Sequence, residues 1–249
     1  MSEVPLKSEA QSDKVETLRR KMMVIDLLTL LKRKYKHREL SEMTGLPPSV
    51  LSRYARRRML PSDERIEEIL SALKKTIRFE DLVKERIKPS KGGYYDVTPL
   101  IWDTAFLRLV AVKVSENFSK YGASKVLTAA ADGVPIACLV GEELGADLVV
   151  AKERKEVGLE DFIEDSYSPT DVAIVRTFYV PRKAIRRNDR LLIVDDVVRT
   201  GGTIAALVRL AERAGGKVIG LFAMVSVGNK WRAIIEEQSI PYYSLLRLP

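Results

Sequence analysis

The stretch LLIVDDVVRTGGT, residues 191–203, decides the fold of this chain. Four apolar residues precede two adjacent acids, Asp195 and Asp196, and hydroxyl and glycine residues follow. The apolar run predicts a buried strand, and the sequence after it predicts a helix over 202–214. In an open parallel sheet, ligands bind beyond the carboxyl ends of the strands, so we expect the two acids at that edge.

The loop between this strand and this helix is suited to phosphate. Main-chain amides at a helix start bind anions, and the helix dipole adds to the attraction. Gly201 and Gly202 let the main chain approach a ligand closely, and Thr200 and Thr203 add hydroxyl donors. The adjacent acids would repel a phosphate, so they need hydroxyl donors or a divalent cation. A ribose 5-phosphate satisfies both halves of the site.

Other kinds of site are excluded or left as alternatives. The sequence has neither the GxxxxGK of a P-loop nor the GxGxxG of a dinucleotide fold. A simple helix cap is the alternative role of the acid pair. A single histidine, His37, excludes a Ser-His pair and a His-ligated zinc site. The single cysteine, Cys138, lies in an apolar segment and is expected to be buried.

The segment 191–203 resembles the phosphoribosyl pyrophosphate (PRPP) motif of type I phosphoribosyltransferases, and the resemblance extends over about 92–249. It implies a parallel sheet under a small hood, with PRPP and Mg²⁺ as ligands. The acid pair would bind the ribose hydroxyls, and the cation would be held through the ligand, with Asp195 and Asp196 as candidates for direct contact. The residues assigned to PRPP or a nucleotide here are Asp195, Asp196, Val198, Arg199, Thr200, Gly201, Gly202 and Thr203.

Two further segments fit the same resemblance. TAAADGVPIA, residues 128–137, is similar to the family's pyrophosphate loop, with Ala130, Ala131, Asp132 and Gly133 at its turn, although it also reads as an ordinary strand-to-helix turn. The polar insertion 150–171 corresponds to the family's flexible loop, and its basic residues Lys152, Arg154 and Lys155 are candidates for pyrophosphate contact or simply solvated charges. Orotate phosphoribosyltransferases carry Lys-Asp-His-Gly there, whereas this chain has Lys-Glu-Val-Gly at 155–158. Orotate transfer is therefore in doubt, and PRPP binding is not.

The net charge of +8 lies entirely in the N-terminal part of the chain. Residues 1–91 hold 22 Lys and Arg against 14 Asp and Glu, whereas residues 92–249 hold 20 of each. A localised basic segment indicates a polyanion partner, or a solvated basic surface.

The same segment predicts four helices, over about 14–34, 38–45, 47–58 and 63–75. The second and third flank Gly45 in the manner of a helix-turn-helix, whose second helix reads the DNA groove. A helical interaction module with a basic face is the alternative. The candidate DNA-binding residues on the outer side of that helix are Ser49, Ser52, Arg53, Arg56, Arg57 and Arg58.

The fold expected is therefore α/β, with a helix-turn-helix domain over residues 1–90 and a phosphoribosyltransferase-like domain over 91–249. In the second domain we expect a helix at 99–119 and another at 134–145, with parallel strands at 125–130, 147–151, 172–178, 190–194 and 217–225.

The combination resembles the purine repressors of Gram-positive bacteria and archaeal regulators with an orotate-transferase-like domain. It implies a cytoplasmic, dimeric transcriptional regulator of nucleotide metabolism that binds double-stranded DNA and has PRPP or a nucleotide as effector. No apolar run of the ~20 residues that span a bilayer is present, so no membrane association is expected. An active phosphoribosyltransferase and an RNA-binding protein are the alternatives.

Overall fold

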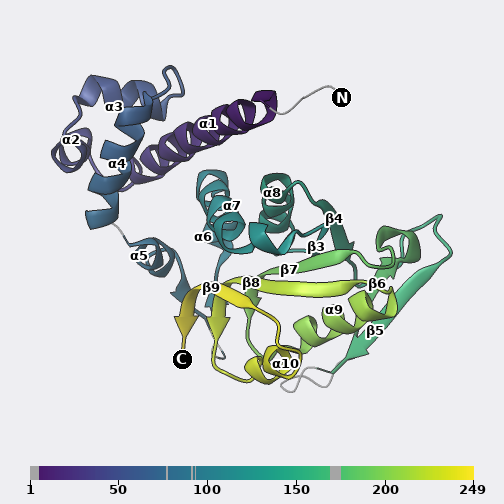
Figure 1. Cartoon of the computed structure of the whole chain (residues 1–249). Helices are drawn as coiled ribbons and strands as arrows, with labels where there is room; N and C mark the ends of the chain where they lie inside the picture. Colours follow the sequence, from purple (N-terminus) through teal and green to yellow (C-terminus); the bar gives the residue numbers. More distant parts are fainter. Residues whose placement is uncertain (1–5, 77, 91, 93, 169–174) are drawn as a thin grey trace, which may run out of the picture. The chain divides into compact units, whose positions relative to one another are not determined.

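The computed structural model describes residues 6–76, 78–90, 92, 94–168 and 175–249 (Figure 1). Its contacts divide the chain into two units. The first comprises the residues up to Leu82 together with Thr104–Leu109, and the second comprises Val83–Asp103 and Val110–Pro249. Within the described residues, no helix is both long enough and apolar enough to cross a membrane.

The first unit is helical, as predicted. Its helices are α1 (Leu6–Leu31), α2 (His37–Thr44), α3 (Pro48–Ala55), α4 (Asp63–Thr76) and the start of α5 (Phe79–Lys84). Ile25, Leu28 and Leu31 of α1 are buried, because they follow the helical spacing that places one face on the other helices. Val15 and Leu18 have the same helical spacing but are about half exposed, at 51% and 50%. The buried face of α1 is therefore shorter than its run of regularly spaced apolar residues.

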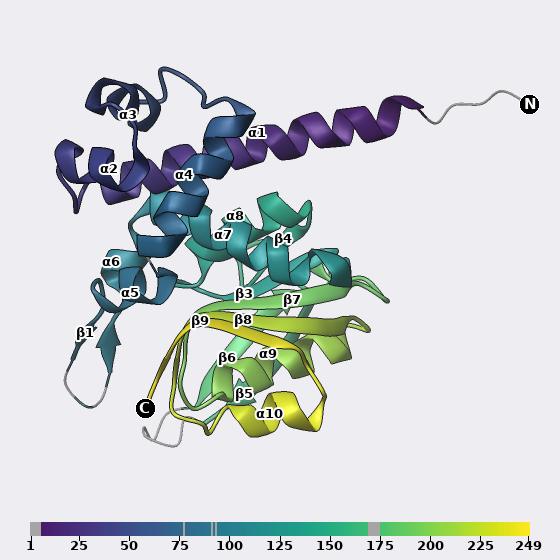
Figure 2. The same ribbon diagram turned by 60° about the vertical axis from the view of Figure 1, so that its left-hand side comes forward.

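The second unit is built on a five-stranded parallel sheet in the order β4-β3-β7-β8-β9. The strands are β3 (Lys125–Ala129), β4 (Asp147–Ala151), β7 (Arg190–Val198), β8 (Lys217–Val227) and β9 (Tyr242–Leu248). The helices are α6 (Thr98–Ile101), α7 (Thr104–Phe118), of which the first six residues belong to the first unit, α8 (Val134–Leu144), α9 (Gly202–Arg213) and α10 (Arg232–Glu237). Helices α8 and α9 lie on opposite faces of the sheet (Figure 2), so the predicted α/β class is confirmed.

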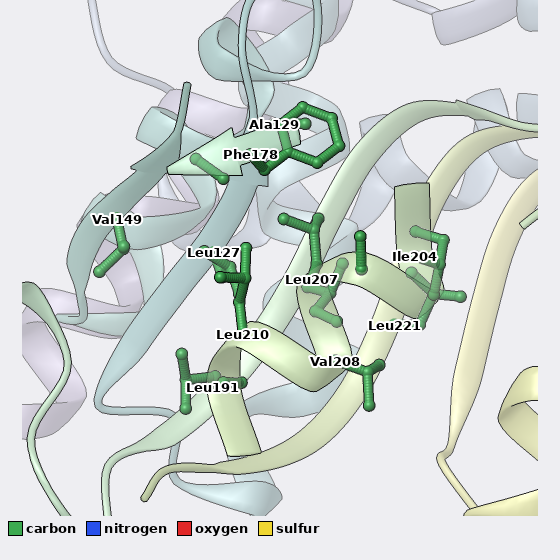
Figure 3. Close-up of a cluster of buried hydrophobic side chains, with 14 of the residues drawn as sticks. Leu127, Ala129, Val149, Phe178, Leu191, Ile204, Leu207, Val208, Leu210 and Leu221 are labelled. Atoms are coloured by element: carbon green, nitrogen blue, oxygen red, sulfur yellow. The ribbon is translucent and has the colours of Figure 1, made fainter. Parts of the chain in front are cut away.

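Helix α9 is held on the sheet by an apolar stripe. Ile204, Leu207, Val208 and Ala211 recur at the spacing of one helix face and are buried against strand residues such as Leu221 (Figure 3). Burying a side chain of this size contributes about 1.5–3 kcal/mol. This packing fixes the N-terminus of α9 at the carboxyl end of β7.

Two pairs of short strands lie outside the parallel sheet. β1 (Lys88–Pro89) pairs antiparallel with β2 (Tyr95–Asp96), and β5 (Phe162–Tyr167) pairs antiparallel with β6 (Arg176–Pro181). The expected parallel strand at 172–178 is therefore wrong where it can be compared, and residues 172–174 lie outside the described residues. In β5, buried and exposed side chains alternate, as is usual in an antiparallel hairpin with one covered face. The insertion 150–171 thus contains a strand.

Two other expectations differ from the structure. The predicted helix at 99–119 is broken between α6 and α7 at Trp102 and Asp103, and Asp is among the residue types favoured just before a helix start. Cys138 is exposed rather than buried, because α8 turns Ala137 and Val140 toward the core and leaves Cys138 on its outer side.

Candidate functional site

The two acids lie inside the last part of a strand. β7 continues to Val198 because its pairing with the longer β8 extends to Ser226, so Asp195 and Asp196 do not follow the strand as predicted. Asp195 is buried, with 7% of its surface exposed, and its Oδ1 accepts a hydrogen bond from the Asp196 N–H at 3.1 Å. The acid pair therefore stands at the carboxyl edge of the sheet on rigid backbone.

The acids at this edge are held in an electrostatically unfavourable state. Burial raises the pKa of Asp195 well above its ordinary value, and the nearby charges of Asp196 and Asp132 raise it further. Burial also raises the pKa of Asp196, and Asp132 adds to that shift, while the hydrogen bond with Asp195 opposes it. Among the described residues, no group of three or more His, Cys, Asp or Glu is placed to hold a metal on its own. Hydroxyl donors, or a cation brought by a ligand, would relieve this repulsion.

Two helices begin beside the acid pair without a side-chain cap. Gly133 precedes α8 and Gly201 precedes α9, and neither helix has a side-chain hydrogen bond at its cap. The alternative that the acid pair caps α9 is therefore wrong. The first N–H groups of a helix have no acceptor inside it, so both ends can receive an anion.

The first of these loops touches the acids directly. The peptide bond between Ala130 and Ala131 is cis, and both residues are exposed with Asp132. A Cβ atom added to Gly133 would lie 2.4 Å from Thr128 Oγ1 and 3.1 Å from Asp195 Oδ1. Only glycine leaves this space, so the predicted pyrophosphate loop meets the acid pair.

The second loop requires its two glycines for different reasons. Gly201 has φ 86°, and a Cβ there would lie 2.5 Å from Ile234 Cδ1 of α10. A Cβ on Gly202 would lie 2.4 Å from Tyr167 Cδ2 of β5. The side chain of Val198 is buried in the core beneath α9, so only its main-chain groups are available to a ligand in the loop. Thr200 and Thr203 are half-buried beside the glycines.

Two tyrosines that the sequence analysis did not single out contact this loop. The Tyr167 hydroxyl lies 2.8 Å from Thr203 Oγ1. The Arg199 guanidinium lies over the ring of Tyr94, 4.1 Å from its centroid. The sequence FIEDSY, residues 162–167, has no apolar alternation that would place Tyr167 on a covered strand face, and nothing in the sequence links Tyr94 to position 199.

Two of the three basic residues of the charged insertion, Lys152 and Lys155, already have partners on or near the hairpin. Lys152 forms an ion pair with Glu156. Lys155 lies 3.2 Å from a Glu164 carboxylate oxygen and 5.0 Å from the centroid of the Tyr179 ring. Arg154 is exposed. Contact between either lysine and a pyrophosphate would therefore require an exchange of partners.

Comparison with known proteins agrees with this geometry. Residues 105–239, more than half of the chain, match the phosphoribosyl transferase domain model, and residues 29–79 match a helix-turn-helix model. The chain belongs to the phosphoribosyl transferase domain family.

Relatives of the chain include phosphoribosyltransferases and a transcriptional repressor. A hypoxanthine/guanine phosphoribosyltransferase of Methanothermococcus okinawensis is 27% identical over 68% of this chain and 92% of its own length. The purine biosynthesis transcriptional repressor PurR of Bacillus subtilis is 24% identical over 66% of this chain and 55% of its own. The crystal structure of an adenine phosphoribosyltransferase from Rhodothermus marinus has a TM-score of 0.59 and 26% identity, covering 68% of this chain and 98% of that one.

The helical unit of this phosphoribosyl transferase domain protein contains the expected helix-turn-helix. Gly45 ends α2 with φ 69°, and its N–H donates to the Ser41 carbonyl at 2.8 Å. The Ser41 hydroxyl donates across the turn to the Leu46 carbonyl at 2.7 Å. Leu46, Leu51 and Tyr54 are buried and form the internal face of this motif.

The predicted DNA-binding residues divide between a helix and the turn after it. Ser49 and Arg53 are exposed on α3, and Ser52 is half-buried there. We expected Arg56, Arg57 and Arg58 on the same helix, but α3 ends at Ala55 because Arg57 takes a left-handed conformation, φ 56°. The exposed residues beyond the end of α3 are Arg56, Arg57 and Arg58.

One of these arginines is tied to a buried acid. The Arg57 Nη2 donates to Asp26 Oδ1 at 2.6 Å, and only 3% of the Asp26 surface is exposed. Arg108, in the part of α7 that belongs to this unit, donates to the same carboxylate at 2.7 and 2.9 Å. The Thr29 hydroxyl on α1 shares its proton between the Ile25 carbonyl of its own helix, at 2.8 Å, and the Ala55 carbonyl, at 3.2 Å. Helix α1 therefore holds the end of α3 through two side chains.

Proposed function

We propose that this protein is a DNA-binding transcriptional regulator whose phosphoribosyl transferase domain binds PRPP or a nucleotide as effector. DNA binding is assigned to residues 1–90 and ligand binding to residues 91–249, in the cytoplasm. One observation carries the proposal: a helix-turn-helix and an acid pair with its two uncapped loops occur in one chain. The relative named as a purine repressor supports it.

In this proposal PRPP is bound by residues with separate tasks. Asp195 and Asp196 accept hydrogen bonds from the ribose hydroxyls, and the amides and hydroxyls of residues 199–203 hold the 5-phosphate. The amides of residues 130–133 face the pyrophosphate.

Magnesium fits the acid pair as a cation that the ligand brings. The buried carboxylates have raised pKa values because burial and neighbouring charges disfavour ionisation, and a positive charge beside them reverses that effect. Asp195 and Asp196 would hold the ion together with pyrophosphate oxygens. When bound, Mg²⁺ neutralises negative charge between the ligand and the acids.

For DNA, α3 would enter the major groove. Ser49, Ser52 and Arg53 on α3 would face base edges, and Arg56 and Arg58 would contact phosphates from the following turn. We propose a homodimer, whose two reading helices meet half-sites about one helical turn, roughly 34 Å, apart.

The test uses the full chain and duplexes selected by it from a random-sequence pool. We expect Arg53→Ala/Arg56→Ala to weaken duplex binding about tenfold or more and to lower the salt slope by up to about 2, because two cationic contacts are lost. PRPP binding, measured by calorimetry with Mg²⁺, should be unchanged. Arg65→Ala on α4 is the control, since Arg65 is exposed in the same unit and paired with Glu68. A wild-type chain that binds no duplex at low salt, or that prefers single-stranded RNA in competition, would overturn the proposal.

A phosphoribosyltransferase activity is the second candidate, favoured by the intact acid pair and loops. It predicts release of pyrophosphate from PRPP with one base among orotate, uracil, adenine, guanine, hypoxanthine and xanthine. The loop sequence Lys-Glu-Val-Gly at 155–158, which lacks the histidine of orotate phosphoribosyltransferases, weighs against orotate. The full panel of bases, assayed with Mg²⁺, separates the candidates, and no turnover with any base ends this one.

A further inference from the structure

Tyr167 lies against the proposed 5-phosphate loop from a different part of the sequence. Its ring occupies the space that a Cβ on Gly202 would need, with Tyr167 Cδ2 at 2.4 Å and Cε2 at 2.5 Å from that position. Its hydroxyl lies 2.8 Å from Thr203 Oγ1. One side chain therefore contacts two consecutive residues of the loop, one by packing and one by a hydrogen bond.

The strand that carries Tyr167 is fastened to the helix that carries the loop. Two positions earlier on the same face of β5, Asp165 is buried, with 5% of its surface exposed. Its carboxylate accepts hydrogen bonds from Arg209 at 2.9 and 2.6 Å and pairs with Arg213 at 3.0 Å. Both arginines belong to α9, whose first turn contains Thr203. The Tyr167 ring also stacks on Phe178 of β6, with 6.0 Å between centroids.

The direction of the hydrogen bond follows from the chemistry of the two hydroxyls. A phenol O–H is more acidic than the O–H of an aliphatic alcohol and is therefore the better hydrogen-bond donor. When the Tyr167 O–H donates to Thr203 Oγ1, the Thr203 proton is free to donate to an anion in the loop. A phosphate has only acceptors to offer, so its presence favours this direction. Hydrogen bonds in such a chain polarise one another and become stronger.

We propose that Tyr167 is a positioning residue for the 5-phosphate: its hydroxyl donates to Thr203 and so directs the Thr203 hydroxyl onto the phosphate of the bound ligand. The inference rests on the proposed binding of PRPP at this loop. It concerns the phosphate end of the ligand only, because Tyr167 contacts Gly202 and Thr203 and the proposed pyrophosphate loop is a different segment, residues 130–133.

The experiment measures binding to the full chain by calorimetry with three probes: PRPP with Mg²⁺, ribose 5-phosphate, and pyrophosphate with Mg²⁺. We expect Tyr167→Phe to weaken PRPP and ribose 5-phosphate about three- to tenfold, as the loss of one hydrogen bond would, and to leave pyrophosphate unchanged. Thr203→Val should weaken the same two ligands. The double variant should bind them no more weakly than Thr203→Val, because the two hydroxyls act in one chain.

The matched control is Ser166→Ala. Ser166 and Thr177 also form a hydroxyl-to-hydroxyl hydrogen bond, 2.8 Å long, on the same hairpin, but on its exposed face. This variant should bind all three probes as the wild type does. Equal affinities for wild type and Tyr167→Phe, additive losses in the double variant, or an equal loss of pyrophosphate binding would each overturn the inference and leave the proposed function standing. A wild-type chain that binds neither PRPP nor ribose 5-phosphate would overturn both.

Discussion

The carboxyl group of Asp195 is buried beside two other acids, Asp196 and Asp132. In the ligand-free chain its negative charge lowers the stability of the fold. A ligand that offers hydroxyl donors or a cation removes this cost, so the charge favours ligand binding. Its pKa is raised by burial first and by the charges of Asp196 and Asp132 second. A residue chosen for stability alone would not carry a negative charge there. Function at this position is therefore separable from folding by a substitution that removes the charge and keeps the shape.

We expect Asp195→Asn to stabilise the ligand-free chain at pH 7 and to abolish PRPP binding. The Tm should rise on the order of 2–4 °C, the shift that about 1 kcal/mol gives in a domain of this size. Because the folded pKa of Asp195 is above the unfolded one, the folded state binds more protons, and the free energy of unfolding falls as pH rises from about 3.8, the ordinary pKa of an aspartate. The gain from Asn should therefore be large at neutral pH and vanish as pH approaches 4. Thermal unfolding from pH 4 to pH 8 measures it.

Asp147→Asn is the control for this prediction. Asp147 is exposed, and the hydrogen bond and charge of Lys125 lower its pKa. Its ionised form thus favours the folded state, and the substitution should not stabilise the chain at pH 7. A Tm of Asp195→Asn equal to that of wild type at every pH would show that the acid pair is not under strain.

The residues of the site could be predicted from sequence to the extent that they are neighbours along the chain. Asp195, Asp196 and the glycines of the loop lie within thirteen residues, so the sequence alone indicates one site for a sugar phosphate. Tyr167 contacts the same loop although it lies 36 positions before Thr203 in the sequence. Tyr94 contacts it from the β1–β2 region. Such contacts depend on tertiary packing, which spacing does not encode.

The short helix α3 depends on other elements for its shape. It spans only Pro48–Ala55, and isolated helices of this length are not stable in water. Its end is held by Thr29 and, through Arg57, by the carboxylate of Asp26. The C-terminal end of the proposed reading helix is thus fixed by α1.

We expect Asp26→Asn to destabilise the helical unit by roughly 1–3 kcal/mol, less than the 3–5 kcal/mol typical of a broken buried pair, because Arg57 and Arg108 are partly exposed. Duplex binding should weaken too, since the turn carrying Arg56–Arg58 loses its anchor. Urea unfolding followed by circular dichroism, and DNA titration, measure the two effects.

Glu67→Gln provides the comparison, because it removes an exposed ion pair with Arg20 between α1 and α4. That change should cost within about 1 kcal/mol. If Asp26→Asn behaves like Glu67→Gln in both measurements, the carboxylate does not anchor α3.

Helices and strands could be predicted from the sequence where the apolar residues follow a single regular spacing or form one continuous run. The burial pattern of α9 follows the helical spacing, and β3 and β4 are apolar runs of ordinary strand length. Strand β5 and its antiparallel pairing with β6 were not anticipated, since β5 lies in a charged segment that reads as a loop and the strand expected at 172–178 was assigned to the parallel sheet. The pairing partner of a strand, and hence its sheet, is fixed by contacts between distant residues.

For the whole molecule, regulation requires that the ligand bind two arrangements of the DNA-binding parts with different affinity. The charge division agrees with separate tasks, because the excess of +8 belongs to residues 1–91 and the remainder is neutral. The sequence predicts DNA binding for one part and ligand binding for the other. The coupling between the two is a property of the assembled protein, so it cannot be predicted from either part alone.

The most direct measurement is the Kd of the wild-type chain for its selected duplex, with and without saturating PRPP and Mg²⁺, at one fixed salt concentration. We predict a change of at least about fivefold, the lower range of typical coupling between sites. The Asp195→Asn/Asp196→Asn variant should bind the duplex with a Kd that PRPP does not alter. An unchanged wild-type Kd, at a PRPP concentration that calorimetry shows to be saturating, would contradict the account.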